Sequence, residues 1–393
     1  MLSRKMLIFL LSLIFSTCIA VLDIGAPGYS CAANLMMRSP TRPTSAHAVR
    51  PADIDIVMAM GDSLTAGFCT DDVDKCHAEY RGLSFGGGEW RGLDTHITLA
   101  NIIQKYNPKA VGGGLNGTGG WNDFPVAQLN CAISGMRANN LPYQAQNIIN
   151  TLKAHPDLFD MQNDWKLLNI FIGYNDLCNC GGNDCYCHNK TAFDAQNYAN
   201  WIRTALNLIR SNVPRVIVNL VQMTHLEHFA GCGTGACGIC NNVTVADLTT
   251  LINQYQAAEK ALETDGEFDT TDDFTLVVQP WFTNNTKPYY PNGTINREFW
   301  AVDCYHYSSY GHALLSSWWW KNMLEPVGMK TPNANLSAPA LPLACPDAEC
   351  PYIRTTKNSV NCQQFNGTCI SDGGSCTTGS SCCSGLCFNK QCS

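Results

Sequence analysis

The sequence is short of charged residues, and those it has are mostly acidic. Only 15% of the 393 residues are charged, and 32 acidic against 25 basic side chains give a net charge of −7. A protein that binds nucleic acid needs a basic face for the phosphates. The balance therefore argues against nucleic acid as a partner, while a hydrophobic fraction of 45% allows a sizeable core.

Long hydrophobic runs are also scarce. The one run of this kind, residues 6–19, follows Arg4 and Lys5 and precedes Ala20, which is the pattern of a secretory signal peptide. The alternative is a membrane anchor, but about 14 apolar residues are short for a span of about 20. We predict a signal peptide at residues 1–20, and neither a later membrane span nor an internal repeat.

Cysteine, by contrast, is abundant. The 22 cysteines are more than a reducing cytosol usually allows as disulfides. Seven Asn-x-Ser/Thr sequons also fit a secretory route and are predicted glycosylation sites: Asn116, Asn189, Asn242, Asn284, Asn292, Asn335 and Asn366. We therefore predict a secreted or lysosomal protein.

The number of cysteines is informative as well. Loss of Cys18 with the signal peptide leaves 21, an odd number. Either a further segment past Cys31 is removed, or Cys131 is a buried free thiol. Residues 39–51 are rich in Pro, Ser and Arg, so residues 21–52 are predicted to be a pro-segment or linker. We expect Cys69 and Cys76 to close a local loop.

Two further groups of cysteines have the close spacing of metal ligands. They span residues 178–187 and 232–240, and zinc sites do use paired cysteines. In an oxidising compartment disulfides are the stronger expectation.

Apolar runs typical of strands alternate with helical stretches between residues 53 and 330. The predicted strands are residues 54–60, 167–173, 215–221 and 274–279. The predicted helices are residues 95–106, 141–155, 193–211, 246–263 and 308–324. This alternation indicates a parallel sheet covered by helices on both faces. We predict an α/β fold, a three-layer α/β/α sandwich, for residues 53–330.

The last predicted helix contains Trp318, Trp319 and Trp320. Because successive helical residues are rotated by about 100°, three in a row are not expected to face one core. The alternatives are packing or one tryptophan at the surface, where it could touch lipid.

The composition changes after Pro326. Residues 331–361, rich in Pro, Ala and Asn, are predicted to be a linker. Residues 362–393 are too few to bury a core, so crosslinks must hold them together. The last six cysteines have the spacing C-x6-C-x5-CC-x3-C-x4-C. Cys362 is left over and is predicted to pair with Cys345 or Cys350.

This spacing resembles that of the inhibitor cystine knot, or knottin, family. From the cysteines alone fifteen pairings are possible, and the resemblance implies three of them: Cys369–Cys383, Cys376–Cys387 and Cys382–Cys392. We predict a small disulfide-rich C-terminal module at residues 362–393, whose partner the sequence does not indicate.

The residues that carry chemistry lie at the two ends of the α/β region. Ser63, in the segment Gly-Asp-Ser-Leu, follows the first strand at its carboxyl end, where open α/β sheets bind their ligands. Asp303 and His306 are three residues apart near the end of the region. A serine hydroxyl needs a base within hydrogen-bond reach, and the base needs a group that orients it. These residues could supply the nucleophile, the general base and the orienting carboxylate.

Attack by a serine also creates an oxyanion, which needs fixed donors. Gly135, in Asn-Cys-Ala-Ile-Ser-Gly, and Asn175, after the second strand, are candidates. Each residue has a plainer interpretation: Ser63 as a helix cap, His306 as a core histidine, Asn175 as a turn residue and Gly135 as a packing residue.

Together the four segments resemble the conserved blocks of the GDSL, or SGNH, hydrolase family, whose sheet is flavodoxin-like. The blocks are GDSL at Ser63, the glycine at Gly135, G-x-N-D at Asn175 and D-x-x-H at Asp303 and His306. The resemblance implies that Ser63 is the nucleophile and His306 the base oriented by Asp303. It also implies an oxyanion hole of Ser63, Gly135 and Asn175, without metal or cofactor.

Several further stretches are similar to the animal-type phospholipase B subfamily over about residues 53–330. They include Tyr-Arg-Gly-Leu-Ser-Phe at 80–85, Phe-Ile-Gly-Tyr-Asn-Asp-Leu-Cys at 171–178 and Leu-Glu-Pro-Val-Gly at 324–328. Tyr174 stands where that subfamily usually has glycine, which could alter the acyl pocket.

The resemblance implies a secreted serine ester hydrolase that releases fatty acids from glycerophospholipids and lysophospholipids, with transient contact to a membrane surface. Two alternatives remain open at this point. One is an SGNH carbohydrate O-acetyl esterase, and the other is a non-catalytic binding protein that acts through its cystine-rich tail.

Overall fold

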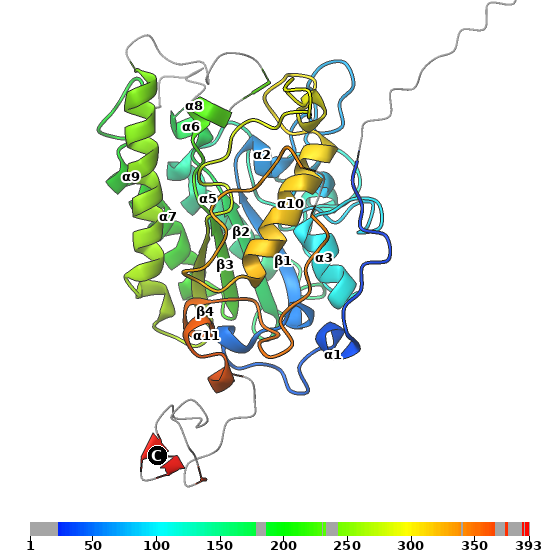
Figure 1. Cartoon of the computed structure of the whole chain (residues 1–393), viewed down its shortest axis with the longest axis vertical. Coiled ribbons are helices and arrows are strands. Elements are labelled where there is room, and N and C mark those ends of the chain that lie inside the picture. Colours follow the sequence, from blue (N-terminus) through cyan, green and yellow to red (C-terminus); the bar gives the residue numbers. More distant parts are fainter. Residues whose placement is uncertain are drawn as a thin grey trace, which may run out of the picture.

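Four parallel strands form the centre of the molecule (Figure 1). The computed structural model describes residues 23–177, 186–229, 231–232, 243–338, 341–365, 374–375, 387–388 and 390–392. The strands are β1 (Ile54–Gly61), β2 (Trp165–Phe171), β3 (Val216–Val221) and β4 (Phe274–Gln279). They pair in the order β1-β2-β3-β4. Every residue of β2, β3 and β4 is buried, as expected for a sheet covered on both faces.

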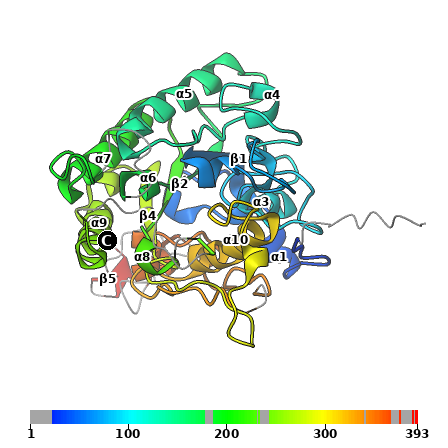
Figure 2. The same ribbon diagram turned by 90° about the horizontal axis from the view of Figure 1, so that it is seen from above.

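Helices cover both faces of this sheet (Figure 2). On one side lie α5 (Leu141–Ala154) and α7 (Ala195–Asn212), with α9 (Val245–Thr264) packed beside α7 and against β4. On the other side lie α3 (Leu99–Tyr106) and α10 (Ser309–Leu324). The predicted three-layer α/β/α sandwich is confirmed.

Short helices complete the fold. They are α1 (Ala33–Met36), α2 (Ser63–Ala66), α4 (Phe124–Ala127), α6 (Tyr174–Leu177), α8 (Leu226–Phe229) and α11 (Thr356–Val360). Two of them, α2 and α6, start directly after the carboxyl ends of β1 and β2, where Ser63 and Asn175 lie.

The free edge of β1 is covered by chain that the sequence does not indicate as a strand. Val111 and Asn130 form isolated parallel bridges to Ile56 and Ala59. This segment lies between β1 and β2 in the sequence but outside β1 in space. The order is therefore that of a flavodoxin-like sheet, in which ligands bind where the strand order reverses. The chain that follows Asn130 leads to Gly135 at that point.

All three tryptophans of α10 are buried, so the interpretation that places one at the surface is wrong. Trp319 packs against Phe85, and Trp320 packs against Tyr106. A later segment of the chain also contacts Trp320, because its indole donates to the carbonyl of Ala344. Neighbouring residues of the helix thus pack against different parts of the core.

The segments before and after the α/β region lie against it and are crosslinked to each other. Cys31 is bonded to Cys345, and Cys350 to Cys362. The second bond decides between the two partners predicted for Cys362. Cys131 is a buried free thiol, which is one of the two explanations for the odd number of cysteines. The boundaries of the signal peptide, linkers and domains stay predictions.

The C-terminal module is described only in part. Strands β5 (Cys387–Phe388) and β6 (Gln391–Cys392) pair in antiparallel fashion. The other cysteines of the predicted knot, and thus its three disulfides, lie outside the described residues, as do the sequons at Asn242 and Asn366. The remaining five sequon asparagines are all exposed and stay predicted glycosylation sites: Asn116, Asn189, Asn284, Asn292 and Asn335.

No helix in the described part of the chain has the length and apolarity that crossing a bilayer requires.

Candidate active site

Ser63 is the first residue of α2, directly beyond the carboxyl end of β1. The cap of this helix is Asp62, whose Oδ1 accepts a hydrogen bond from the Leu64 N–H at 2.9 Å. The Ser63 side chain is thus not used for capping, which removes the plainer interpretation of this serine. Gly61 lies two residues before Ser63 and is held by the side-chain amide of Gln144. The amide accepts from the Gly61 N–H and donates to the Gly61 carbonyl, both at 2.8 Å. The turn that presents Ser63 is therefore fixed from both sides.

Asp303 and His306 lie in a tight turn just before α10. The Asp303 Oδ1 accepts hydrogen bonds from the backbone N–H groups of Tyr305 and His306, both at 3.0 Å. Cys304, inside the turn, has a positive φ of 62°. It is bonded to Cys232, so a disulfide holds this turn against the chain that follows α8.

The structure brings the three predicted residues into one hydrogen-bonded chain. The Nε2 atom of His306 lies 2.8 Å from the Ser63 Oγ. The Nδ1 atom lies 2.5 Å from the Asp303 Oδ2. Each neighbour thus faces a different ring nitrogen, which is the arrangement that a serine nucleophile, its base and its orienting acid require.

The charge of Asp303 is favoured by this arrangement. Burial opposes it, but the hydrogen bond from the His306 ring and those from the two backbone N–H groups hold the pKa of Asp303 below its ordinary value. The carboxylate therefore stays ionised at neutral pH and can stabilise a protonated imidazole.

The predicted oxyanion donors lie around the same serine. Asn175 is 5% exposed, and its amide donates one hydrogen bond to the Met136 carbonyl at 3.0 Å. A second amide hydrogen of Asn175 is left for a ligand. Gly135 has a φ of 78°, a conformation that favours glycine. Among the described residues, no acceptor takes the backbone N–H of Ser63 or Gly135.

A family model with the description GDSL-like Lipase/Acylhydrolase matches residues 57–319. The chain belongs to the GDSL-like lipase/acylhydrolase family. All five predicted site residues fall inside the matched range. The family assignment confirms the resemblance inferred from the four sequence blocks.

The curated proteins to which the chain is similar include membrane-associated phospholipase B1 from mammals. The protein from Mus musculus is 36% identical over 338 residues, which is 81% of this chain and 22% of that protein. The one from Homo sapiens is 35% identical over 351 residues, 84% of this chain and 23% of that protein. The chain thus spans less than a quarter of the length of these relatives. Their similarity confirms the predicted likeness to animal-type phospholipase B.

Among solved structures, a GDSL-like lipase from Parabacteroides merdae is similar over 68% of this chain and 94% of its own. The sequence identity is 17% and the TM-score is 0.36.

Outside the four GDSL-like lipase/acylhydrolase blocks, the structure identifies a group of buried polar residues that sequence reasoning missed. Arg81 is fully buried, and its Nη1 donates to the carbonyls of Asn130 and Ala132, both at 2.8 Å. Its Nη2 pairs with Glu79 at 2.5 Å. The other carboxylate oxygen of Glu79 accepts from the hydroxyl of Ser134, the residue before Gly135. Arg81 and Glu79 therefore hold the loop that carries Gly135.

The same group reaches α2. The Asn130 amide donates to the Thr65 carbonyl at 2.9 Å, and the Ser84 hydroxyl donates to the same carbonyl at 2.6 Å. The turn of Ser63 and the loop of Gly135 are thus linked by a buried network. The only signal for it in the sequence is the segment Tyr-Arg-Gly-Leu-Ser-Phe, which contains Arg81 and Ser84 but names no role for them.

Tyr174, where the phospholipase B subfamily usually has glycine, is buried beside Asn175. Its hydroxyl lies 2.9 Å from that of Tyr307, and its ring packs edge-on against Phe171. The side chain is directed into the aromatic core under the His306 turn, where it is accommodated by Tyr307.

Two buried acids lie beneath the site. Burial raises the pKa of Asp62 to about 7 and that of Asp176 to about 7. At neutral pH neither acid carries a full negative charge. This reduces the repulsion that a developing oxyanion would meet from below.

Some of the other predicted cysteine pairs can also be placed. Cys69 is bonded to Cys76, as expected, and the two sulfurs lie within 4.8 Å of an Asp303 carboxylate oxygen. Cys187 is disulfide-bonded, as expected for its group. The other members of that group and Cys237 and Cys240 lie outside the described residues.

Proposed function

We propose that this chain is a serine ester hydrolase that releases fatty acids from glycerophospholipids and lysophospholipids through an acyl-enzyme. The observation that carries the proposal is the hydrogen-bonded chain from Ser63 through His306 to Asp303. It supplies an activated alcohol without a metal, and the family supplies the class of reaction.

In the first half of the reaction, Ser63 attacks the ester carbonyl. The Nε2 of His306 takes the hydroxyl proton as the serine Oγ–carbon bond forms. The negative charge moves to the former carbonyl oxygen, which the N–H groups of Ser63 and Gly135 and the amide of Asn175 stabilise. His306 then returns the proton to the leaving glycerol oxygen, and the carbon–oxygen bond of the substrate breaks.

In the second half, water replaces the alcohol. His306 removes a proton from this water, whose oxygen attacks the acyl-serine carbonyl, and then returns the proton to Ser63 as the fatty acid leaves. In both halves Asp303 accepts a hydrogen bond from the Nδ1–H of His306, so that Nε2 faces the reacting groups.

The proposal for a phospholipid substrate rests on the relatives. Phospholipase B1 from two mammals is 35–36% identical over more than 80% of this chain. We carry over the substrate class from those proteins, with the buried Tyr174 as the main local difference beside the oxyanion residue.

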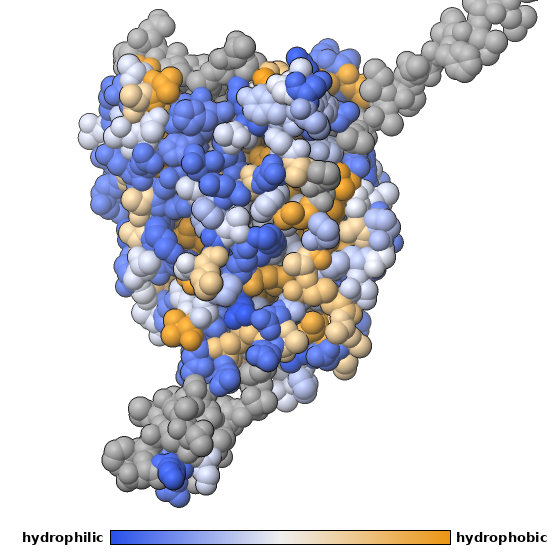
Figure 3. Space-filling view, viewed as in Figure 1, coloured by the Kyte–Doolittle hydropathy of each residue, from blue (hydrophilic) through white to orange (hydrophobic). Residues whose placement is uncertain are grey.

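We further propose that the protein touches a membrane surface transiently, through isolated apolar side chains beside the site. Val302, next to Asp303, is 42% exposed, and Val73, inside the loop closed by Cys69 and Cys76, is 69% exposed. The face drawn in Figure 3 carries hydrophobic residues in small patches among polar ones rather than in one broad patch. Weak contact suits an enzyme that must leave the surface after each encounter.

The disulfides fit a protein of the secretory pathway. We propose that it is secreted or delivered to the lysosome, after removal of the signal peptide at residues 1–20.

A comparison of substrates tests the proposed function. The purified protein is offered diacyl phospholipid, lysophospholipid and an acetylated sugar side by side, and the released acids are identified. We expect long-chain fatty acids from both lipids, and none from the variant Ser63→Ala with an unchanged circular dichroism spectrum. Release of acetate alone would favour the carbohydrate esterase, and no release from any substrate would favour the binding protein.

A further inference from the structure

Arg137 lies in the loop that carries Gly135, and part of its guanidinium has no partner among the described residues. Arg137 comes two residues after Gly135, and its backbone N–H donates to the Asn140 side chain at 3.0 Å. Its Nε donates to the carbonyl of Asn175 at 3.1 Å. The side chain is thus anchored between the two side-by-side segments that carry the proposed oxyanion donors.

Within the described ranges, the rest of the guanidinium has no partner: neither Nη atom of Arg137 donates a hydrogen bond, and no carboxylate oxygen lies within ion-pair distance of it. Burial raises the pKa of Asp176, and Arg137 is close enough for its charge to oppose part of that rise. Both Asp176 oxygens, however, accept from the Ala138 N–H. A half-buried arginine beside Asn175 therefore keeps two donor groups without an acceptor in the part of the chain that the structure describes.

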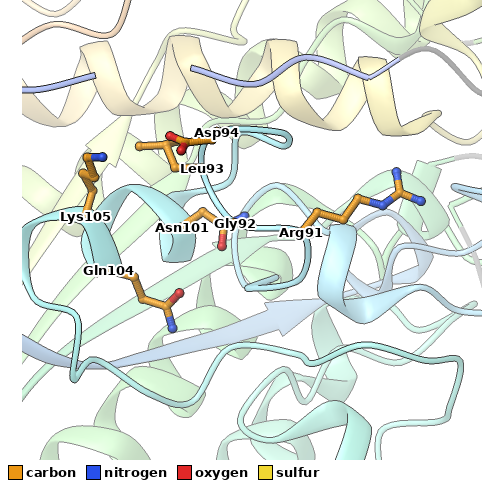
Figure 4. Close-up of a pocket in the computed structure, with 7 residues that line it drawn as sticks. All are labelled: Arg91, Gly92, Leu93, Asp94, Asn101, Gln104 and Lys105. Atoms are coloured by element: carbon orange, nitrogen blue, oxygen red, sulfur yellow. The ribbon is translucent and has the colours of Figure 1, made fainter. Parts of the chain in front are cut away.

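Other arginines of the molecule differ in this respect. Arg81 is paired with Glu79, and Arg91 is paired with both Asp23, at 3.0 Å, and Asp71, at 2.5 Å. Arg91 lines a cavity of about 300 Å³ on α3. Figure 4 shows Arg91 and Lys105 at opposite ends of that cavity. Its arginine is already neutralised by two carboxylates, so the cavity offers a poorer anion site than Arg137 does.

We propose that Arg137 binds the phosphodiester of the substrate while Ser63 attacks its ester. This inference rests on the proposed function and specifies how the substrate is recognised. A guanidinium matches the oxygens of a phosphate with parallel donors. With Nε held by the Asn175 carbonyl, the Nη groups are the ones left to do so.

The position of Arg137 beside the proposed oxyanion donors suits a glycerophospholipid. The ester carbon and the phosphorus of such a lipid are separated by only a few covalent bonds of the glycerol backbone. The Nε of Arg137 is held 3.1 Å from the carbonyl of Asn175, and Arg137 follows Gly135 by two residues, so its guanidinium lies beside both residues proposed to hold the ester oxygen. A substrate held by Arg137 and by these donors would place its phosphate on the Asn175 side of Ser63.

The selectivity between two lipids with the same acyl chains tests this proposal. The substrates are a diacyl phosphatidylcholine and the matching diacylglycerol, each in micelles of an uncharged detergent, so that only the phosphate-bearing headgroup differs. We expect Arg137→Gln to lower kcat/KM for the phospholipid roughly 10- to 100-fold more than for the diacylglycerol, the usual size of a lost hydrogen bond to a charged group. Arg137→Lys should recover part of the difference.

The control is Arg297→Gln, which removes an exposed arginine whose Nη2 lies 3.9 Å from the Sγ of Cys304. It should leave the ratio of the two substrates unchanged. An equal loss on both lipids in Arg137→Gln would show that Arg137 serves only to hold Asn175, and no loss on either would show that it serves neither role. Both results would overturn the inference. A wild-type protein without activity on either lipid would instead contradict the proposed function.

A second measurement does not depend on the folding of a variant. Hydrolysis of a soluble p-nitrophenyl ester by the wild type is measured with an alkylphosphocholine or with an uncharged alkyl glycerol of the same chain length. Stronger inhibition by the phosphocholine is expected. Equal inhibition by the two amphiphiles would argue against a phosphate site at Arg137.

Discussion

The Nε2 atom of His306 lies 2.8 Å from the Oγ of Ser63, although 243 residues separate them in the sequence. The two are brought together by different parts of the fold. Ser63 is presented by the turn between β1 and α2, and His306 by the turn before α10. A bond of this length lets a proton pass directly between hydroxyl and imidazole.

Asp303 orients His306, and its removal should affect the rate far more than substrate binding. We expect Asp303→Asn to lower kcat by roughly 10³- to 10⁴-fold, because the amide no longer favours the imidazole tautomer whose Nε2 accepts the serine proton. Steady-state kinetics on a soluble ester would measure this. Asp74→Asn, in the exposed loop between Cys69 and Cys76, is the control. A loss of less than tenfold would contradict the orienting role.

The depressed pKa of Asp303 also predicts how its contribution to stability depends on pH. Since the folded pKa lies below the unfolded value of about 3.9, the contribution is fully present above that value. It is lost as the pH falls through the folded pKa. Urea unfolding should therefore show the wild type to be more stable than Asp303→Asn at pH 6, and the difference should shrink toward pH 2. A difference that grows on acidification would be inconsistent with the depressed pKa.

Asn175 is expected to act in the transition state rather than in substrate binding. Loss of one oxyanion donor typically lowers kcat by about 10²- to 10³-fold, and we expect this loss for Asn175→Ala with little change in KM. The control is Asn150→Ala, at an exposed position on α5. A raised KM with an unchanged kcat would show that Asn175 binds the substrate in its ground state instead.

Cys131 should be chemically inert in the folded protein. It is a free thiol that is 1% exposed, and burial raises its pKa to about 12, so thiolate is scarce at pH 8. Peptide mapping after treatment with iodoacetamide, without a reductant, should find Cys131 unmodified in the native protein and alkylated in urea. Modification of Cys131 before unfolding would contradict its burial.

The parts of the fold that the sequence predicts well are those with a strong local pattern. The strands β1 to β4 are mostly apolar because both faces of the sheet are covered. Polar residues, Ser63 and Asn175, lie just beyond the ends of β1 and β2. That a residue follows a buried strand can be recognised from the sequence alone. In a parallel sheet this position places both residues at the same edge.

Features that depend on distant chain could not be predicted in this way. The segment beside β1 makes only isolated bridges at Val111 and Asn130, too short for a strand pattern. The burial of Trp320 depends on Ala344. Arg81 donates to the backbone carbonyls of residues 130 and 132. Every residue has such a carbonyl, so the residue type does not reveal which ones accept a hydrogen bond.

Labelling with a fluorophosphonate, followed by mass spectrometry of the peptides, tests the central claim most directly. The reagent reacts with a serine only where a base activates the hydroxyl and an oxyanion hole receives the phosphoryl oxygen. We predict one adduct, on Ser63, formed in parallel with the loss of esterase activity and absent from His306→Ala. Loss of activity with Ser63 unmodified, or an adduct on a different serine, would contradict the account.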